Sequence, residues 1–416
     1  MVRSVDPSFI AGEIKSPSSK SMTQRAIAAA MLAKGSSIIK NPSYCNDSLA
    51  AMSIARGFGA KIVPEESLMY VTGRPGVTDN TLNCGESGLA IRMFSPIAAL
   101  FPEKIVMLGK GSLRNRPMQM IGDALIQLGA RFESTGGFLP LTIQGPLKGG
   151  RCEIDGSVSS QLLTGLLMAL PLTAEDSEIF VTNLKSKPYV DMTMKVLRDF
   201  GITVSHEDYK LFTIRGRQAY SPVNIEVEGD WSGGAFLLVA GAINGNVVVR
   251  GLQAGSCQSD RAILEAMEKA GAMITISQDW ISVTKSDMKA FEFDATDAPD
   301  LFPPLAALAA YCNGISRIKG ASRLIHKESN RAAALISEFG KMNIEIRLED
   351  DLMLITGGRT MGAAVSSHND HRIAMAAAVA ALGAEGRVSI ADSQCVAKSY
   401  PDFFNDLMKA GVSVIE

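Results

Sequence analysis

The segment GFGAKIV (Gly57–Val63) joins the end of a helical pattern to a short alternating run. A glycine just past a helix is the usual left-handed cap, and the alternation after it predicts a strand. Five later segments carry the same mark: QLGARFE (Gly129), DFGITVS (Gly201), KAGAMIT (Gly271), EFGKMNIEI (Gly340) and KAGVSVI (Gly411). Successive glycines are 70, 72, 70, 69 and 71 residues apart. This regular spacing predicts six copies of one structural unit.

Each copy also holds an apolar helical segment with a polar start. In SPSSKSMTQRAIAAAMLAKG (Ser16–Gly35), small and basic residues are followed by a run with almost no polar face. Its counterparts are GESGLAIRMFSPIAAL, SSQLLTGLLMALPL, GDWSGGAFLLVAGAI, PDLFPPLAALAAY and NDHRIAMAAAVAAL. A helix that is apolar all round belongs in a core, whereas the free N–H groups at its start suit anions. Each unit therefore combines one buried helix, one amphipathic helix and several short strands.

The length of the units predicts the fold class. Units of roughly 70 residues exceed solenoid repeats, so we expect an α/β (α+β) fold of two similar domains with three units each. The chain midpoint lies near EVEGDWSGGAF (Glu226–Phe236), where we place one crossover, and a second crossover is expected near Gly12–Lys15. The expected domains are residues 1–12 with 230–416, and residues 13–229, joined by short hinges.

Composition excludes several classes of protein. The 416 residues carry a formal net charge of −2, which argues against a nucleic-acid or membrane-surface binder. Apolar runs are interrupted before about 18 residues, so no membrane-spanning helix is expected. The N-terminal segment lacks the apolar run of a signal peptide. The six cysteines form no CxxC pair and no metal-ligand pattern with histidine, which predicts reduced thiols in a cytoplasmic protein.

Polar residues at the starts of the buried helices are candidates for binding. These are Lys20, Ser21 and Arg25; Gly85–Gly88; Ser159, Ser160 and Gln161; Asp300; and Asp370, His371 and Arg372. Helix capping explains any one of them, because serine, aspartate and asparagine are the favoured N-cap residues. Capping does not explain Lys20, Arg25 and Arg372 beside otherwise buried helices. A buried cation needs an anion, and a bound anionic ligand is one candidate.

Three loops add further basic residues. They are GKGSLRNRPM (Gly109–Met118) with Arg116, HKESNR (His326–Arg331) with Lys327, Glu328 and Arg331, and CVAKSYPDFF (Cys395–Phe404) with Lys398. Each alone is explained by solvated surface charge, but arginine also binds carboxylate and phosphate with two parallel hydrogen bonds. Glycine-rich nucleotide motifs, a GxSxG elbow and a Ser–His–Asp arrangement are missing from the sequence. The residues thus suggest acid–base group transfer on anionic small molecules, without nucleotide, metal or redox cofactor.

The motifs together resemble the enolpyruvyl transferase family, and within it the 5-enolpyruvylshikimate-3-phosphate (EPSP) synthases. KSxxxR, RPM, DGSVSSQ, SKPYVD, EGDxS, PD, KES-R, NDHRxAM and AKSYPDFF occur in family order over nearly the whole chain. The resemblance implies an inside-out α/β barrel type of fold, with the active site in the cleft between the two domains. It also implies transfer of the enolpyruvyl group of phosphoenolpyruvate to the 5-hydroxyl of shikimate 3-phosphate, with release of phosphate through a tetrahedral intermediate. No cofactor is implied, and a cytoplasmic monomer is expected.

The resemblance assigns residues to each substrate. For shikimate 3-phosphate they are Lys20, Ser21, Arg25, Ser159, Ser160, Gln161, Ser186, Tyr189, Asp300 and Lys327. For phosphoenolpyruvate they are Lys20, Gly88, Arg116, Gln161, Arg331, Arg372 and Lys398. Asp300 resembles the family's candidate base for the hydroxyl, and Glu328 and Lys20 resemble its proton-transfer groups.

The sequence departs from the family pattern at several positions. Ser18 replaces a glycine, Glu86 and Leu89 replace asparagine and threonine in the GESGLA loop, and Arg323 replaces an asparagine. An acidic Glu86 would repel an anion unless it is turned away or paired with Arg116 or Arg92. The alternatives are the sister UDP-N-acetylglucosamine enolpyruvyl transferase, whose loop cysteine is missing here, and an anion-binding homologue with impaired catalysis. The RNA 3′-phosphate cyclase class is disfavoured because the chain has no net positive charge.

Overall fold

The computed structural model describes residues 1–325 and 327–416. The chain forms two compact units, of residues 18–227 and of residues 1–17 with 228–416. The first crossing lies after Pro17, later than the expected division after residue 12. Strand β2 (Ile10–Lys15) explains the difference, because it pairs with β15 (Gly245–Arg250) as far as Lys15.

In the described part of the chain, the unit of residues 18–227 holds three four-stranded sheets. Their strand orders are β14 (Asn224–Glu226), β3 (Gly35–Lys40), β5 (Leu68–Gly73), β4 (Lys61–Pro64); then β6 (Thr81–Asn83), β7 (Lys104–Leu108), β9 (Phe138–Gln144), β8 (Arg131–Thr135); then β10 (Gly150–Asp155), β11 (Ser177–Thr182), β13 (Leu211–Ile214), β12 (Val204–Glu207). Its helices are α1 (Lys20–Leu32), α2 (Asn46–Gly57), α3 (Gly88–Ala98), α4 (Gln119–Gln127), α5 (Gln161–Ala169) and α6 (Lys187–Asp199).

The other unit repeats this arrangement in its described residues. Its four-stranded sheets are β2, β15, β17 (Trp280–Thr284), β16 (Met273–Ile276); then β19 (Glu292–Asp294), β21 (Ile315–Lys319), β23 (Leu352–Thr356), β22 (Glu345–Glu349); then β24 (Ala364–Ser366), β25 (Val388–Ala391), β1 (Val2–Val5), β26 (Val414–Ile415). Short strands β18 (Met288–Lys289) and β20 (Cys312–Asn313) pair separately. Its helices are α7 (Trp231–Asn244), α8 (Ile263–Ala270), α9 (Phe302–Ala309), α10 (Arg331–Lys341), α11 (His371–Ala381) and α12 (Phe403–Lys409).

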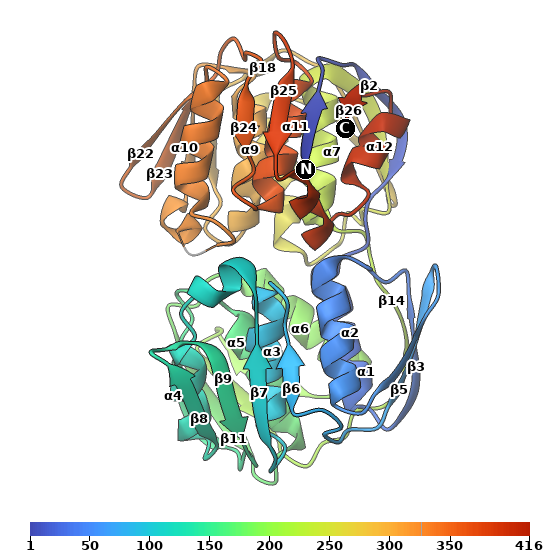
Figure 1. Ribbon diagram of the computed structural model, residues 1–416, viewed down its shortest axis with the longest axis vertical. Helices are drawn as coiled ribbons and strands as arrows, with labels where there is room; N and C mark the ends of the chain where they lie inside the picture. Colours follow the sequence, from blue (N-terminus) through green and yellow to red (C-terminus); the bar gives the residue numbers. More distant parts are fainter. Residues whose placement is uncertain (326) are drawn as a thin grey trace. The chain divides into compact units, whose positions relative to one another are not determined.

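One pairing pattern is common to the four-stranded sheets of both units. The first strand runs parallel to the second, the third is antiparallel to the second, and the fourth is antiparallel to the third. A parallel pair needs a crossover connection, and a buried helix supplies it in most copies. The predicted sixfold repeat is therefore present as one topology, with β14, β2 and β1 contributed from distant parts of the sequence (Figure 1).

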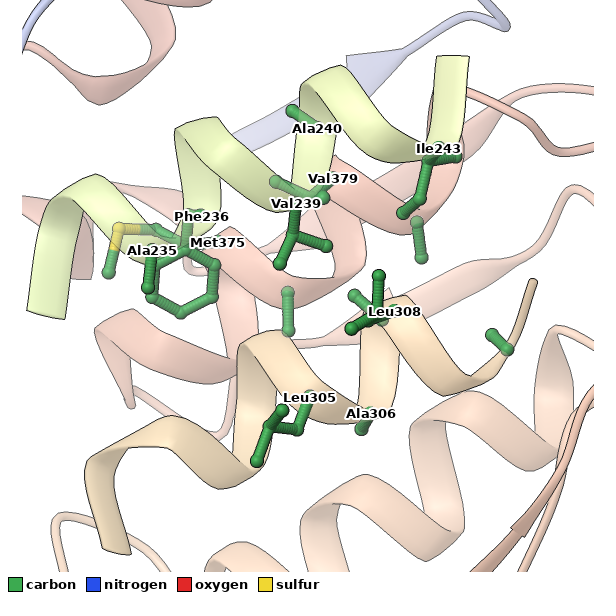
Figure 2. Packing of buried hydrophobic residues seen from close by; sticks show 14 of the residues in the cluster. Ala235, Phe236, Val239, Ala240, Ile243, Leu305, Ala306, Leu308, Met375 and Val379 are labelled. Carbon is green, nitrogen blue, oxygen red and sulfur yellow. The ribbon is translucent and has the colours of Figure 1, made fainter. Parts of the chain in front are cut away.

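The apolar helices form the core of each unit. Helices α3 and α5 pack closely within residues 18–227, and α7, α9 and α11 pack against one another in the other unit. Figure 2 shows this second core, in which Phe236, Val239 and Ile243 of α7 are buried together with Leu308 of α9 and with Met375 and Val379 of α11. Figure 1 shows the sheets and the amphipathic helices, such as α10, around these helices within each unit. No helix among the described residues is both long and apolar enough to span a bilayer.

The predicted cap glycines are mostly where the repeat requires them. Gly59, Gly129, Gly201, Gly271 and Gly411 have φ between 81° and 93°, the left-handed conformation that glycine adopts without strain. The prediction for Gly340 is wrong, because α10 continues through Lys341. Asn343 takes the left-handed conformation instead, with φ 65°. Asparagine is among the few other residues that tolerate it, so the glycine pattern missed this copy by three positions.

Candidate active site

Helix α1 begins with the basic residues that the sequence singled out. Ser19 caps it, and its hydroxyl accepts a hydrogen bond from the backbone N–H of Met22 at 3.4 Å. The ammonium of Lys20 lies 3.0 Å from a carboxylate oxygen of Asp47, in the first turn of α2. Both side chains are largely buried, so Asp47 orients the charge of Lys20 and keeps it at the helix start.

Arg25, one turn further along α1, is buried and held by oxygen atoms of three helices. Its Nε donates to the hydroxyl of Thr193 at 2.9 Å, and its Nη2 donates to the Thr164 hydroxyl and the Tyr189 carbonyl, each at 3.3 Å. Its Nη1 donates to the Ser21 carbonyl at 2.9 Å. These acceptors fix the guanidinium of Arg25 beside the starts of α5 and α6.

The starts of α5 and α6 carry the predicted serines. The Ser159 hydroxyl accepts from the backbone N–H of Gln161 at 3.1 Å, and Ser160 is the residue before α5. The side-chain oxygen Oε1 of Gln161 accepts from Nη1 of Arg92 at 3.0 Å. Ser186 precedes α6 with φ 57°, an uncommon conformation for serine. Such strain outside glycine is tolerated where the surrounding structure imposes it, often at functional sites.

The GESGLA loop leads into α3 beside three polar side chains. Ser87 caps α3 by accepting from the Ala90 N–H at 3.2 Å, and its hydroxyl donates to the side-chain oxygen Oε1 of Gln24 at 3.1 Å. A Cβ atom placed on Gly88 would lie 2.7 Å from Nη1 of Arg116 and 3.1 Å from Nη1 of Arg92. Two guanidinium groups therefore stand directly over Gly88, and a side chain at this position would displace them.

Glu86, which replaces the asparagine of the family pattern, packs against the basic loop that leads to Arg116. A Cβ atom on Gly111 would lie 2.5 and 2.6 Å from the two carboxylate oxygens of Glu86, so the carboxylate packs over that glycine. Gly111 itself has φ 55°, and it begins the short helix Gly111–Asn115 that leads to Arg116. Glu86 thus contacts the backbone of the basic loop, and a residue larger than glycine at position 111 would displace it.

In the other unit, Asp300 is the centre of a cluster of cations. One carboxylate oxygen accepts from Nη1 of Arg331 at 2.7 Å and from the Lys327 ammonium at 3.3 Å. The other oxygen accepts from Nη2 of Arg372 at 3.0 Å. Asp300 keeps 21% of its side chain exposed, so the carboxylate remains accessible at the start of α9.

The charges of this cluster shift one another's protonation equilibria. Burial alone would raise the pKa of Asp300, but its three cationic neighbours hold that pKa well below the usual value. Burial lowers the pKa of Lys327, and Asp300 opposes part of that shift. The cluster therefore holds Asp300 ionised and makes it a weak base until something draws its cations away.

Arg331 joins Asp300 to two further carboxylates. Its Nε donates to Asp370 at 2.8 Å, and its Nη2 donates to Glu328. Although burial acts in the opposite direction, Asp370 and the other carboxylates raise the pKa of Arg331 well above its usual value. Asp370 is fully buried and also caps α11 by accepting from the backbone N–H of Arg372 at 3.0 Å. Helix α11 is thereby bound to the start of α10 through one ion pair.

Lys398 is the last residue of the short helix Ser393–Lys398, which packs against α11. It is 5% exposed, although lysine is rarely buried this far. Together with Arg372, which is 4% exposed, it places a second largely buried cation beside α11. Among the described residues, no cluster of histidine, cysteine, aspartate and glutamate is suited to hold a metal ion.

The predicted residues thus form two sets, one in each unit. Residues 18–227 bring together Lys20, Ser21, Arg25, Gly88, Arg116, Ser159, Ser160, Gln161, Ser186 and Tyr189 near the starts of α1, α3, α5 and α6, whereas the other unit holds Asp300, Lys327, Glu328, Arg331, Arg372 and Lys398. Sequence reasoning missed Asp47, Thr164 and Thr193, which hold Lys20 and Arg25. The periodicity of α5 and α6 marks these threonines as core positions, where polar residues are rare without a partner.

Comparison with known proteins identifies the family of the chain. The sequence matches the family model of EPSP synthase (3-phosphoshikimate 1-carboxyvinyltransferase) over residues 5–407. The chain belongs to the EPSP synthase family. A 3-phosphoshikimate 1-carboxyvinyltransferase of Methanocorpusculum labreanum is 38% identical over 419 residues, covering 99% of both chains. One of Clostridium perfringens is 36% identical over 413 residues, covering 98% of this chain and 97% of the relative.

Solved structures extend the family relationship to the fold. An EPSP synthase from Acinetobacter baumannii superposes with a TM-score of 0.86 at 27% identity, covering all of both chains. The enolpyruvyl transferase NikO from Streptomyces tendae has a TM-score of 0.80 at 17% identity, covering 100% of this chain and 98% of NikO, and shares the fold. The sequence-based assignment to the enolpyruvyl transferases, and within them to the EPSP synthases, is confirmed.

Proposed function

We propose that this protein transfers the enolpyruvyl group of phosphoenolpyruvate to the 5-hydroxyl of shikimate 3-phosphate and releases phosphate. The observation that carries the proposal is the carboxylate of Asp300 at the start of a buried helix, with three cations within 3.3 Å. A base that must act beside two anionic substrates needs such cations to neutralise the incoming charge.

Shikimate 3-phosphate is assigned to the polar helix starts of residues 18–227, with Asp300 and Lys327 from the other unit. Arg25 supports this role because hydroxyl and carbonyl oxygens at 2.9–3.3 Å hold its guanidinium at these helix starts, and a guanidinium binds phosphate with two parallel hydrogen bonds. The residues proposed to contact this substrate are Lys20, Ser21, Arg25, Ser159, Ser160, Gln161, Ser186, Tyr189, Asp300 and Lys327.

Phosphoenolpyruvate carries a phosphate and a carboxylate, so it needs several cations. Gly88 supports the assignment of phosphoenolpyruvate to this place, because the absence of a side chain lets the guanidinium of Arg116 lie over the start of α3. The residues proposed to contact phosphoenolpyruvate are Lys20, Gly88, Arg116, Gln161, Arg331, Arg372 and Lys398. The proposal requires residues of both units to act on the same pair of substrates.

The proposed chemistry has an addition step and an elimination step. In the addition, the 5-hydroxyl oxygen bonds to C2 of phosphoenolpyruvate, its proton passes to Asp300, and C3 gains a proton from Glu328 or Lys20. In the elimination, C3 returns a proton to the group that supplied it, the double bond forms again, and the C2–O bond to phosphate breaks, while the proton held by Asp300 leaves with the phosphate or to solvent. As the anions of phosphoenolpyruvate engage Arg331 and Arg372, Asp300 regains basicity when the proton must be removed.

The test is release of inorganic phosphate with both substrates together. We expect release with shikimate 3-phosphate plus phosphoenolpyruvate, and none with either substrate alone. UDP-N-acetylglucosamine replaces shikimate 3-phosphate in a parallel assay. Release only with the UDP-sugar would assign the sister activity, and binding of both substrates without release would favour an anion-binding homologue. We expect the enzyme to act as a monomer in the cytoplasm, and sedimentation at assay concentration tests its oligomeric state.

A further inference from the structure

A buried carboxylate of α10, that of Glu338, holds the loop that leads into α11. Its side chain is 1% exposed, and each of its two oxygen atoms accepts a hydrogen bond from this loop. One oxygen accepts from the backbone N–H of Ser366 at 2.8 Å, and the other accepts from Nε2 of His368 at 2.8 Å. An ionised carboxylate can only accept, so the imidazole of His368 donates from Nε2. Glu338 therefore ties α10 to the chain just before α11.

The loop of residues 366–369 has an uncommon backbone conformation. His368 and Asn369 have φ of 51° and 54°, in the left-handed region that residues other than glycine seldom adopt. Within the loop, the hydroxyls of Ser366 and Ser367 accept from the N–H groups of His368 and Asn369, each at 3.1 Å. Two left-handed residues in succession persist where the surrounding structure imposes them, and Glu338 is part of that structure.

The loop leads directly to two residues of the candidate active site. Asp370 follows it, and the carboxylate of Asp370 accepts from Nε of Arg331 at 2.8 Å. Arg372 lies in the first turn of α11 and donates to Asp300 at 3.0 Å. Because the backbone from the loop to α11 is continuous and short, a displacement of the loop also displaces these two side chains.

We propose that Glu338 is a positioning residue, which fixes the loop before α11 through His368 and Ser366 and thereby places Arg372 beside Asp300. The inference rests on the proposed function, which assigns Arg372 to phosphoenolpyruvate. Burial would raise the pKa of Glu338, but Lys341 and the donors of the loop outweigh it and lower that pKa to about 2. The carboxylate is therefore ionised near neutral pH, where both of its oxygen atoms accept hydrogen bonds.

A purely structural role for Glu338 makes a different prediction. The ammonium of Lys341 donates to the same carboxylate at 2.6 Å, but Lys341 belongs to α10 and not to the loop. Removal of Lys341 therefore weakens the interactions of the buried carboxylate without releasing the loop. If Glu338 contributes only stability, loss of either side chain should have similar kinetic effects, whereas a positioning role predicts effects for Glu338 alone.

The experiment compares Glu338→Gln and His368→Asn with the wild type and with the control Lys341→Met. Glutamine has one acceptor oxygen in its amide, so either Ser366 or His368 loses its acceptor whichever way the amide turns. His368→Asn removes the imidazole at a side chain that is 41% exposed, and asparagine tolerates the left-handed conformation. This second variant therefore keeps the test valid if Glu338→Gln folds poorly.

Phosphate release at pH 7.5 is measured with one substrate varied and the other saturating. We expect KM for phosphoenolpyruvate to rise about tenfold in Glu338→Gln and in His368→Asn, because a small displacement of Arg372 weakens its contact with that substrate. KM for shikimate 3-phosphate should change less than about twofold, and Lys341→Met should behave like the wild type. The double variant should be no worse than the poorer single variant, because both residues act through one contact.

Three kinetic results would overturn the proposal. They are an unchanged KM for phosphoenolpyruvate in Glu338→Gln and His368→Asn, an equal rise in KM for both substrates, and the same rise in Lys341→Met. The last two results would assign Glu338 to general stability.

A measurement without substrate tests the hold of Glu338 on the loop separately. Backbone amides of residues 366–372 should exchange their hydrogens faster in Glu338→Gln than in the wild type and in Lys341→Met, because local opening becomes easier. Unchanged exchange in an active enzyme would overturn the role of Glu338 and leave the proposed function standing. Absence of turnover in the wild type would instead overturn the proposed function.

Discussion

The ion pair between Arg331 and Asp370 makes a quantitative prediction about stability. In Asp370→Asn, the side chain keeps its cap on α11, because asparagine caps a helix about as well as aspartate. The amide nitrogen then faces Nε of Arg331 and the hydroxyl of Ser329, which donate to Asp370 Oδ2 at 2.8 and 3.1 Å in the wild type. Two donors thus lose their acceptor in a buried site.

The expected cost follows from burial and from the remaining partners. Removing one member of a buried ion pair costs about 3–5 kcal/mol when the other charge is left alone. Arg331 still pairs with Asp300 at 2.7 Å and with Glu328, so the lower end applies. We expect Asp370→Asn to lower the free energy of unfolding by about 3 kcal/mol.

Equilibrium urea unfolding at pH 7.5 measures this change, with the midpoint and the slope followed separately. The matched control is Glu385→Gln, which breaks an Arg–Glu pair with Arg359 on the surface of the same unit. Exposed pairs are screened by water, so the control should unfold like the wild type. A loss below about 1 kcal/mol in Asp370→Asn, similar to that of an exposed pair, would refute the reasoning.

The remaining predictions concern catalysis, binding and pH. Asp300→Asn should reduce phosphate release to background while shikimate 3-phosphate still binds by calorimetry; unchanged turnover would remove Asp300 from the mechanism. Thr193→Val takes away the 2.9 Å acceptor of Arg25 Nε and should raise KM for shikimate 3-phosphate about tenfold, with KM for phosphoenolpyruvate unchanged. An equal rise in both would indicate general disruption. Lys341 and other donors outweigh the effect of burial and lower the pKa of Glu338 to about 2. The stabilisation by ionised Glu338 is present above pH 4.5 and is lost as the pH falls toward 2. At pH 7, Glu338→Gln should therefore have a free energy of unfolding about 2 kcal/mol below that of the wild type, and near pH 2 the two should be equal. Urea titration measures both values. A difference in the free energy of unfolding that does not depend on pH would contradict this role of Glu338.

The regularity of the fold was largely predictable from the sequence. Glycine is nearly obligatory where a helix ends in the left-handed conformation, so Gly59, Gly129, Gly201, Gly271 and Gly411 leave a visible period. The same argument failed at Gly340 because Asn343 serves as the cap, and asparagine occurs in too many other places to be recognised. Apolar helices without a polar face were equally recognisable, since burial on all sides excludes polar residues.

In the candidate site, the sequence made the cations recognisable but not the residues that hold them. Cations at the starts of apolar helices stand out in the sequence, because charge is otherwise rare there. Their partners do not stand out: Asp47 lies 27 residues from Lys20, and Thr193 lies 168 residues from Arg25. Such pairs form only when separate helices pack side by side, so the spacing of residues along the sequence does not predict them.

Sequence alone determined the repeated unit, the buried helices and the family, because each depends on residue types at short and regular spacing. Only the tertiary structure decided which charges share a partner. Arg372 lies 72 residues beyond Asp300 in the chain, yet the packing of α11 against α9 brings it within 3.0 Å. Glu338 is an ordinary acidic residue in the sequence, and it meets His368, 30 residues further along the chain, only because α10 packs against α11. Electrostatic interaction depends on distance through space and on exclusion of water, and both are products of the folded core.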